Sequence, residues 1–79
     1  HSHLNNAEII QIQLEAFEKW FELGQLNSLP SMIFIHGVGK GKLKAEIHEL
    51  LKMKKGVNRF INQYSDFYGF GATEVFFEY

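Results

Sequence analysis

Apolar residues in the first third of the chain recur with the period of an α-helix. Four of them follow that spacing: Ile10, Leu14, Phe17 and Phe21. Asn5 is a favoured N-cap residue, and Glu8 stands three positions later, as in a capping box. Gly24 is a typical helix stop. We therefore predict one helix between Asn5 and Gly24, with Trp20 packed in the core beside the two phenylalanines.

A continuous apolar run, residues 31–36 (SMIFIH), follows a short loop. Such a run predicts a strand that is buried on both of its faces. A glycine-rich loop then leads to a second amphipathic helix, predicted from roughly Lys42 to Lys55 and followed by Gly56. His48 lies at the boundary of the apolar face of this helix, and we expect it to be exposed to solvent.

Two more strands are predicted towards the C-terminus. Residues 57–63 (VNRFINQ) have a mixed pattern. Residues 72–79 (ATEVFFEY) alternate, which places Thr73, Val75 and Phe77 on one side of the strand. The order of helix, strand, helix, strand, strand predicts a two-layer α/β (α+β) sandwich.

The segment between these two strands, residues 64–71 (YSDFYGFG), is rich in turn-forming residues and in aromatic rings. We expect Phe67, Tyr68 and Phe70 to pack over the core, as large apolar side chains generally do. The alternative is that they form an exposed aromatic contact for another protein.

The first predicted helix has no strand before it, although a helix with so wide an apolar face normally follows a strand in a β-α-β unit. We therefore expect an opening strand that is missing from this chain. Residues 1–3 (HSH) resemble the end of a purification tag and are set aside. Residues 4–79 are then expected to form a single domain.

Composition narrows the class of protein. The chain has 79 residues, of which 46% are hydrophobic, a globular composition. It contains no cysteine, so disulfides and thiolate metal sites are excluded, and a cytoplasmic location is expected. No apolar run approaches the roughly 18 residues of a membrane span, so we expect no membrane partner.

The charges are unevenly distributed. Seven of the eight basic residues lie within residues 40–59, where only Glu46 and Glu49 carry negative charge. Such a block favours a localised anion-binding face, although a solvated, lysine-rich helix is equally compatible with it.

The glycine loop, residues 34–42 (FIHGVGKGK), carries the candidate chemistry. A strand, a glycine loop and a helix together present backbone N–H groups to a phosphate, and lysines beside them add full charges. The loop lacks the Ser or Thr of a P-loop and the spacing of a dinucleotide fingerprint. The phosphate-binding residues predicted here are Gly37, Gly39, Lys40, Gly41, Lys42 and Lys44.

His36 stands at the carboxyl end of the predicted strand, where α/β folds place functional groups. Its imidazole could serve as a general acid or base, or it could only pin the loop by a hydrogen bond to backbone. No His or carboxylate has metal-ligand spacing with His36, so no metal site is predicted. No cofactor is required on these grounds, although Mg²⁺ could assist cleavage of a phosphodiester.

Two separated motifs resemble the Smr (small MutS-related) domain family. They are the His-Gly-x-Gly loop at residues 36–39 with Leu43-Lys44 after it, and the late strand motif GFGATEV at residues 69–75. The resemblance implies a β-α-β-α-β-β fold, similar to the C-terminal domain of translation initiation factor 3. It looks closest to a branch in which the domain ends a longer bacterial protein.

The resemblance also implies work on nucleic acid. It points to an endonuclease that nicks DNA or cleaves RNA, with His36 catalytic and the glycine loop on the phosphate backbone. The acidic strand motif that usually precedes the first helix of the family does not occur here, so this chain could lack catalysis. A non-catalytic nucleic-acid-binding or protein-interaction module of a larger protein is the alternative. Oligomeric state, and DNA as against RNA, stay open.

Overall fold

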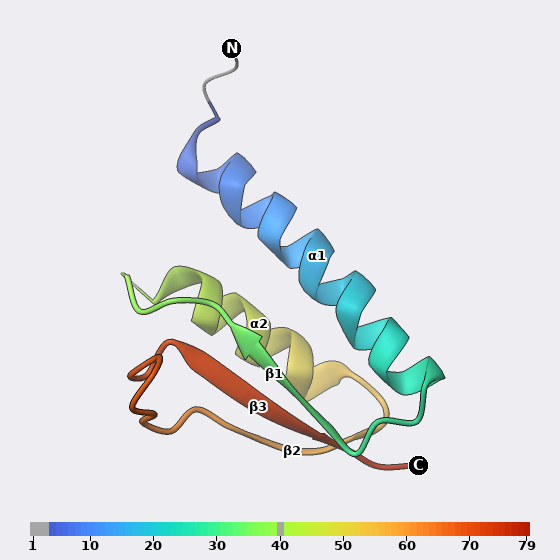
Figure 1. The fold of residues 1–79 in the computed structure, drawn as a ribbon. Coiled ribbons are helices and arrows are strands. Elements are labelled where there is room, and N and C mark those ends of the chain that lie inside the picture. The colour runs from blue at the N-terminus through green and yellow to red at the C-terminus, as the bar shows by residue number, and fades with distance from the viewer. Residues whose placement is uncertain (1–3, 40) are drawn as a thin grey trace.

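The computed structural model describes residues 4–39 and 41–79, and their elements follow the predicted order (Figure 1). The elements are α1 (Asn6–Leu26), β1 (Ser31–Ile35), α2 (Lys42–Met53), β2 (Val57–Ile61) and β3 (Ala72–Phe77). The predicted two-layer α+β class is therefore confirmed. The expected strand ahead of α1 stays a prediction.

The three strands form an antiparallel sheet in the order β1-β3-β2, so β3 lies in the centre. In this register Phe34 of β1 lies opposite Thr73, and Phe60 of β2 lies opposite Val75. Both helices pack against the face of the sheet that carries these four side chains. The buried apolar cluster consists of Phe17, Phe21, Phe34, Ile47, Leu51, Val75 and Phe77.

The start of α1 is fixed by its own sequence. The Asn5 side chain accepts a hydrogen bond from the Glu8 backbone N–H at 2.8 Å, and the Glu8 carboxylate accepts one from the Asn5 N–H at 3.0 Å. The predicted capping box is thereby confirmed, and two helix N–H groups that would otherwise lack partners are satisfied.

The predicted stop at Gly24 is wrong, because α1 continues to Leu26 and ends at the C-cap Asn27. Gly24 is instead buried where the helix meets the sheet, and a Cβ there would overlap the sulfur of Met32. Gly24 therefore allows α1 to lie close to the sheet and does not end the helix. The second helix also ends slightly earlier than predicted, at Met53.

Aromatic rings join α1 to the sheet. The centroids of Phe17 and Phe34 lie 4.7 Å apart, and those of Phe21 and Phe77 lie 5.3 Å apart, in edge-on geometries that aromatic pairs prefer. The prediction that Trp20 belongs to this core is wrong, because 54% of its surface is exposed. Trp20 lies on the side of α1 that faces solvent.

The prediction that β1 is buried on both faces is also wrong. Phe34 is buried, but Ile33 and Ile35 are 58% and 61% exposed. The physical reason is that both helices cover one face of the sheet, so alternate side chains of the edge strand β1 point to the uncovered face. A run of apolar residues does not distinguish this case from a strand covered on both sides.

Candidate functional site

The loop between β1 and α2 turns three times through left-handed backbone. Gly37, Gly39 and Gly41 have φ values of +78°, +40° and +78°. Side chains other than glycine are strained in this region, which explains why glycines alternate here. The loop thereby brings the chain directly from the end of the sheet to the start of α2, whose N-cap is Gly41.

The N-terminus of α2 faces this loop. The first hydrogen bond of the helix runs from the Ala45 N–H to the Gly41 carbonyl at 2.9 Å. The N–H groups of residues 42–44 therefore have no acceptor within the helix, and the positive end of the helix dipole lies here. Lys42 and Lys44 belong to the same turn, and Lys40 lies outside the described residues.

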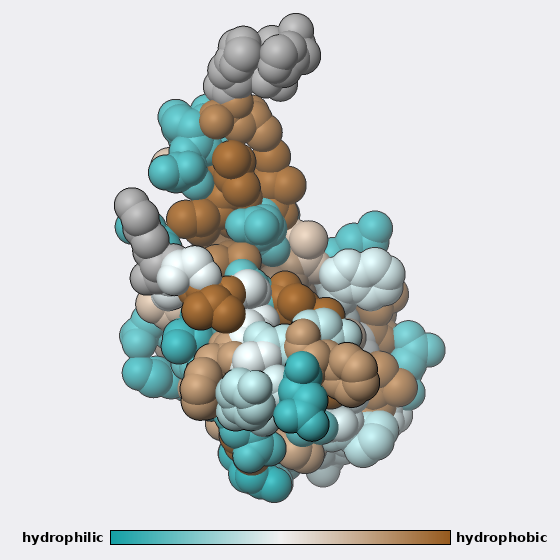
Figure 2. All heavy atoms as spheres, turned by 60° about the vertical axis from the view of Figure 1, so that its left-hand side comes forward, coloured by the Kyte–Doolittle hydropathy of each residue, from teal (hydrophilic) through white to brown (hydrophobic). Residues whose placement is uncertain are grey.

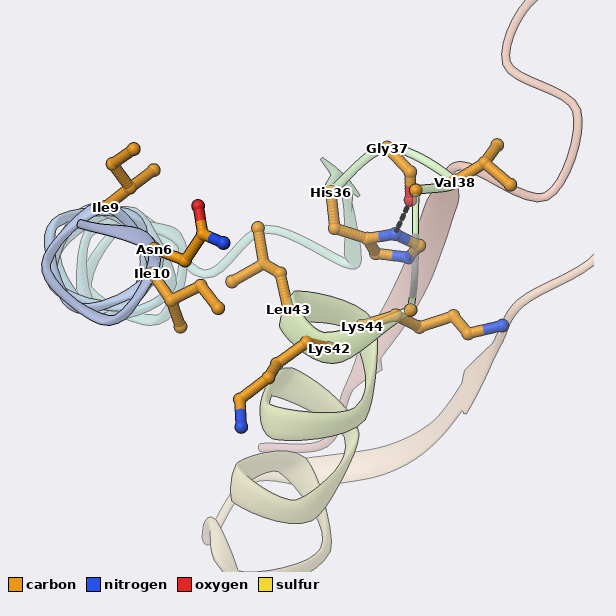
Figure 3. Close-up of a pocket in the computed structure, with 11 residues that line it drawn as sticks. Asn6, Ile9, Ile10, His36, Gly37, Val38, Lys42, Leu43 and Lys44 are labelled. Atoms are coloured by element: carbon orange, nitrogen blue, oxygen red, sulfur yellow. Dashed lines mark hydrogen bonds between the residues drawn. The ribbon is translucent and has the colours of Figure 1, made fainter. Parts of the chain in front are cut away.

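A cleft of about 310 Å³ lies between the first turns of α1 and this loop. Figure 3 shows Leu43 between Ile10 and the His36 ring, while the Lys42 and Lys44 side chains extend in different directions. One wall of the cleft is therefore apolar and the other carries the glycine loop. The lining residues are Asn6, Ile9, Ile10, His36, Gly37, Val38, Gly39, Gly41, Lys42, Leu43 and Lys44.

The His36 ring is held at both nitrogens. Nδ1 lies 2.8 Å from the carbonyl oxygen of Gly37, and Nε2 lies 2.8 Å from Oγ1 of Thr73. A carbonyl can only accept, so Nδ1 carries a proton and donates it to Gly37. In the neutral ring Nε2 is then the acceptor of the Thr73 hydroxyl. His36 was considered either as an acid or base or as a residue that holds the loop by a hydrogen bond to backbone, and the bond to the Gly37 carbonyl is of the second kind.

His48 is a further member of the site, and the prediction that it is exposed to solvent is wrong. It is half-buried, and its Nε2 lies 2.8 Å from the same Thr73 hydroxyl. Because that hydroxyl has one proton, which goes to neutral His36, His48 is the donor to Thr73. Two imidazoles thus share one fully buried hydroxyl.

The surroundings of His48 oppose its charged form. Burial lowers the pKa of His48 below its ordinary value, and the positive charges of Lys44 and Lys52, together with that of His36 in its protonated form, lower it further. The ring of Phe60 packs against it, with the centroids 4.9 Å apart. His48 is therefore a neutral hydrogen-bond donor at neutral pH.

The basic block divides into two groups. Lys42 and Lys44 stand at the N-terminus of α2, and Lys44 Nζ donates to Asn62 at 3.3 Å. At the opposite end of the helix, Lys52 pairs with Glu49 at 2.9 Å and Lys54 pairs with Glu18. The first group thus places two positive charges at the edge of the cleft, on side chains that extend in different directions, while the second group serves contacts within the fold.

The rings between β2 and β3 are not packed over the core, which contradicts the prediction made for them. Phe67 is 90% exposed, Phe70 52% and Tyr68 46%. Tyr68 and Phe67 line a hollow with Ile33 and Glu74, on the face of the sheet that the helices do not cover. No described element packs over the rings there. The rings are exposed, as the alternative requires, and their contact with another protein stays a prediction.

Neither a metal site nor a membrane-spanning helix is found among the described residues. Within residues 4–39 and 41–79, no three His, Asp or Glu side chains are grouped so that they could hold a metal ion. In the same part of the chain no helix is long and apolar enough to cross a membrane.

Comparisons with known proteins agree with the fold and the motifs. The model of the Smr domain family matches residues 8–78. The chain is 31% identical over 70 residues to Endonuclease MutS2 of Aquifex aeolicus, an alignment that covers 89% of the chain and 9% of that protein. It resembles the crystal structure of the Smr domain of Thermus thermophilus MutS2 with a TM-score of 0.78 and 25% identity, covering 89% of this chain and 88% of that one. The chain therefore belongs to the Smr domain family.

Proposed function

We propose that this domain binds the phosphodiester backbone of nucleic acid at the glycine loop and the first turn of α2. The observation that carries the proposal is the meeting of three anion-binding features beside His36: left-handed glycines, the N-terminus of α2, and Lys42 with Lys44. The name of the Aquifex relative, an endonuclease, supports nucleic acid as the source of the phosphate.

Each feature contributes differently. Backbone N–H groups and the helix dipole offer fixed partial positive charge at no reorganisation cost, and glycines allow the phosphate to approach the backbone closely. The lysines hold neighbouring phosphates at longer range. None of these groups reads a base edge, so binding is expected to be independent of sequence.

Cleavage of the bound phosphodiester is a second candidate function, and the link between His36, Thr73 and His48 favours it. In this scheme His36 Nε2 leaves Thr73 and accepts the proton of the attacking oxygen, from water or a ribose hydroxyl. That oxygen forms a bond to phosphorus while the bond to the leaving oxygen breaks, the leaving oxygen takes up a proton from water, and His36 later returns its proton to solvent. The bond from Nδ1 to the Gly37 carbonyl would orient the ring.

Backbone binding is tested by salt dependence. For duplex DNA the logarithm of the binding constant falls by about 0.9 per neutralised phosphate for each unit of log salt, and by about 0.7 for single strands. Lys44→Ala and Lys42→Ala should each flatten the slope by about one such contact. Lys55→Ala, just beyond the C-terminal end of α2, is the matched control and should leave the slope unchanged. A flat response in the unmodified chain would overturn the proposal.

Cleavage is tested separately with supercoiled plasmid and with RNA, in the presence and absence of Mg²⁺. The catalytic scheme predicts cutting that His36→Ala abolishes while backbone binding is retained. Binding without cutting in the unmodified chain would instead identify a binding module.

A further inference from the structure

We propose that the connection between β2 and β3, residues 62–71, is a stacking platform for the bases of single-stranded nucleic acid whose backbone lies on the glycine loop. The proposal rests on the function proposed above and adds to it the class of substrate. The residues we assign to the platform are Tyr64, Phe67, Tyr68 and Phe70.

The rings of this platform are exposed to an extent that packing within the domain does not explain. Tyr64 is 64% exposed and Phe67 90% exposed. The rings also stand near one another: the centroids of Tyr64 and Phe70 are 5.6 Å apart, and those of Phe67 and Tyr68 are 6.3 Å apart. Four exposed aromatic side chains in one short segment form an apolar patch, and contact with water is unfavourable for such a patch. Patches of this kind mark binding sites.

The backbone beneath the rings is held in place. Ser65 and Gly69 form a bridge with two hydrogen bonds of 2.8 Å, and the Ser65 hydroxyl accepts from the N–H groups of Phe67 and Tyr68. The Asn62 amide donates to the carbonyls of Phe70 and Ala72, which closes the base of the segment. The rings are therefore presented by a fixed turn, which lowers the entropy lost on stacking.

The platform is attached directly to the glycine loop. The Gly71 carbonyl accepts hydrogen bonds from the N–H groups of both His36 and Gly37, each at 2.9 Å. On the other side, Asn62 joins the Lys44 ammonium to the Phe70 carbonyl. Figure 1 shows both loops at the same end of the sheet. In this proposal the bound strand passes around this end of the sheet, with phosphates on the glycine loop and Lys44 and with bases at the rings.

The charges favour this occupant and its orientation. Asp66 in the turn and Glu74 on β3 stand on the platform side, so phosphates are repelled from it and attracted to the lysines at the glycine loop. Base faces are uncharged and stack on aromatic rings, which requires that they not already be stacked on one another. A single strand meets this requirement, whereas the base faces of a duplex are covered.

The test compares three probes in the intact chain by fluorescence anisotropy: a labelled mixed-sequence single strand, an abasic strand of equal length with the same phosphates, and a blunt duplex. We expect the normal strand to bind more tightly than the other two. Stacking of one base is worth a factor of about 5 to 150 in affinity. Equal binding of the normal and abasic strands would overturn the platform while leaving the backbone-binding proposal intact.

Substitutions then locate the stacking. Phe67→Ala and Phe67→Leu should both lower affinity for the normal strand by about 5-fold or more and leave the abasic strand unaffected. Trp20→Ala is the matched control, because Trp20 is also exposed but lies on α1. Unchanged thermal unfolding confirms that the variants fold, as expected for so exposed a ring. If Phe67→Leu binds like the unmodified chain, apolar area and not stacking is responsible, and the proposal fails.

Discussion

The buried hydroxyl of Thr73 connects two histidines that lie on different elements. It is fully buried and contacts His36 and His48, each at 2.8 Å. A polar group buried this deeply requires partners, because an unsatisfied one costs about 1–3 kcal/mol. The need to satisfy Thr73 therefore orients both imidazole rings, including that of His36, which precedes the glycine loop in the sequence.

The lowered pKa of His48 makes a prediction about stability and pH. Above its ordinary value of 6.5, His48 is neutral in both the folded and the unfolded chain and contributes nothing. Below 6.5 the unfolded chain takes up the proton first, so the free energy of unfolding falls as pH falls, until the folded pKa is passed. Urea unfolding at pH 7 and pH 5.5 should show this loss.

His48→Gln is the variant that isolates this effect. The amide keeps a donor for Thr73 but does not titrate, so the decrease between the two pH values should be smaller than in the unmodified chain. An equal decrease in both proteins would assign the pH dependence to other groups.

The two histidines also show what the sequence can and cannot predict about the site. His36 was identified because it adjoins the glycines, a local pattern. The burial of His48 cannot be predicted locally, because its contact with Thr73 spans 25 residues and depends on where α2 lies on the sheet. The signal that could have found it was Thr73 itself, a hydroxyl predicted on the same side as Val75 and Phe77 and therefore in need of a partner.

Elements with strong local signals were predicted well. The capping box of α1 is made within four residues, so its sequence suffices. The predictions are wrong where burial depends on a neighbouring layer. Trp20, Ile33 and Phe67 are apolar but lie on surfaces that no described element covers. Hydrophobic pattern indicates that a side chain prefers burial, and only the arrangement of layers determines whether it is buried.

The packing of the two loops against each other predicts the effect of a change at Gly71. A Cβ at this position would stand 2.8 Å from the Tyr68 carbonyl oxygen and 3.2 Å from the Gly37 Cα, and these backbone atoms cannot move aside singly. Gly71→Ala should therefore lower the free energy of unfolding by about 1–3 kcal/mol, measured by chemical denaturation.

The same variant should separate the two loops and weaken binding of the normal single strand. Gly69→Ala is a useful comparison, because its Cβ would meet no atom within 4 Å, although its φ of +57° adds backbone strain. Stability of Gly71→Ala equal to that of the unmodified chain would show that the loops are not in tight contact.

At the scale of the whole molecule, the core lies between the C-terminal two-thirds of α1, α2 and one face of the sheet. Two isoleucines on helices test this placement: Ile47 is 3% exposed and Ile12 is 51% exposed. Ile47→Val should cost about 0.5–1.5 kcal/mol, because a buried methyl group is lost. Ile12→Val has the same chemistry and similar helix propensity, and should change stability by less than about 0.5 kcal/mol. Thermal or urea unfolding of both variants measures these two changes, and equal losses of stability would contradict this placement of the core.

The first turns of α1 extend past the sheet, and Figure 2 shows apolar side chains uncovered along them. The buried phenylalanines of α1, Phe17 and Phe21, lie in the second half of the helix. Amide hydrogens near Ile9 should therefore exchange with solvent by local fraying, faster than those near Phe21, which open only with the whole domain. Because those first turns form one wall of the cleft, such fraying would change the width of the cleft while the glycine-loop wall stays in place.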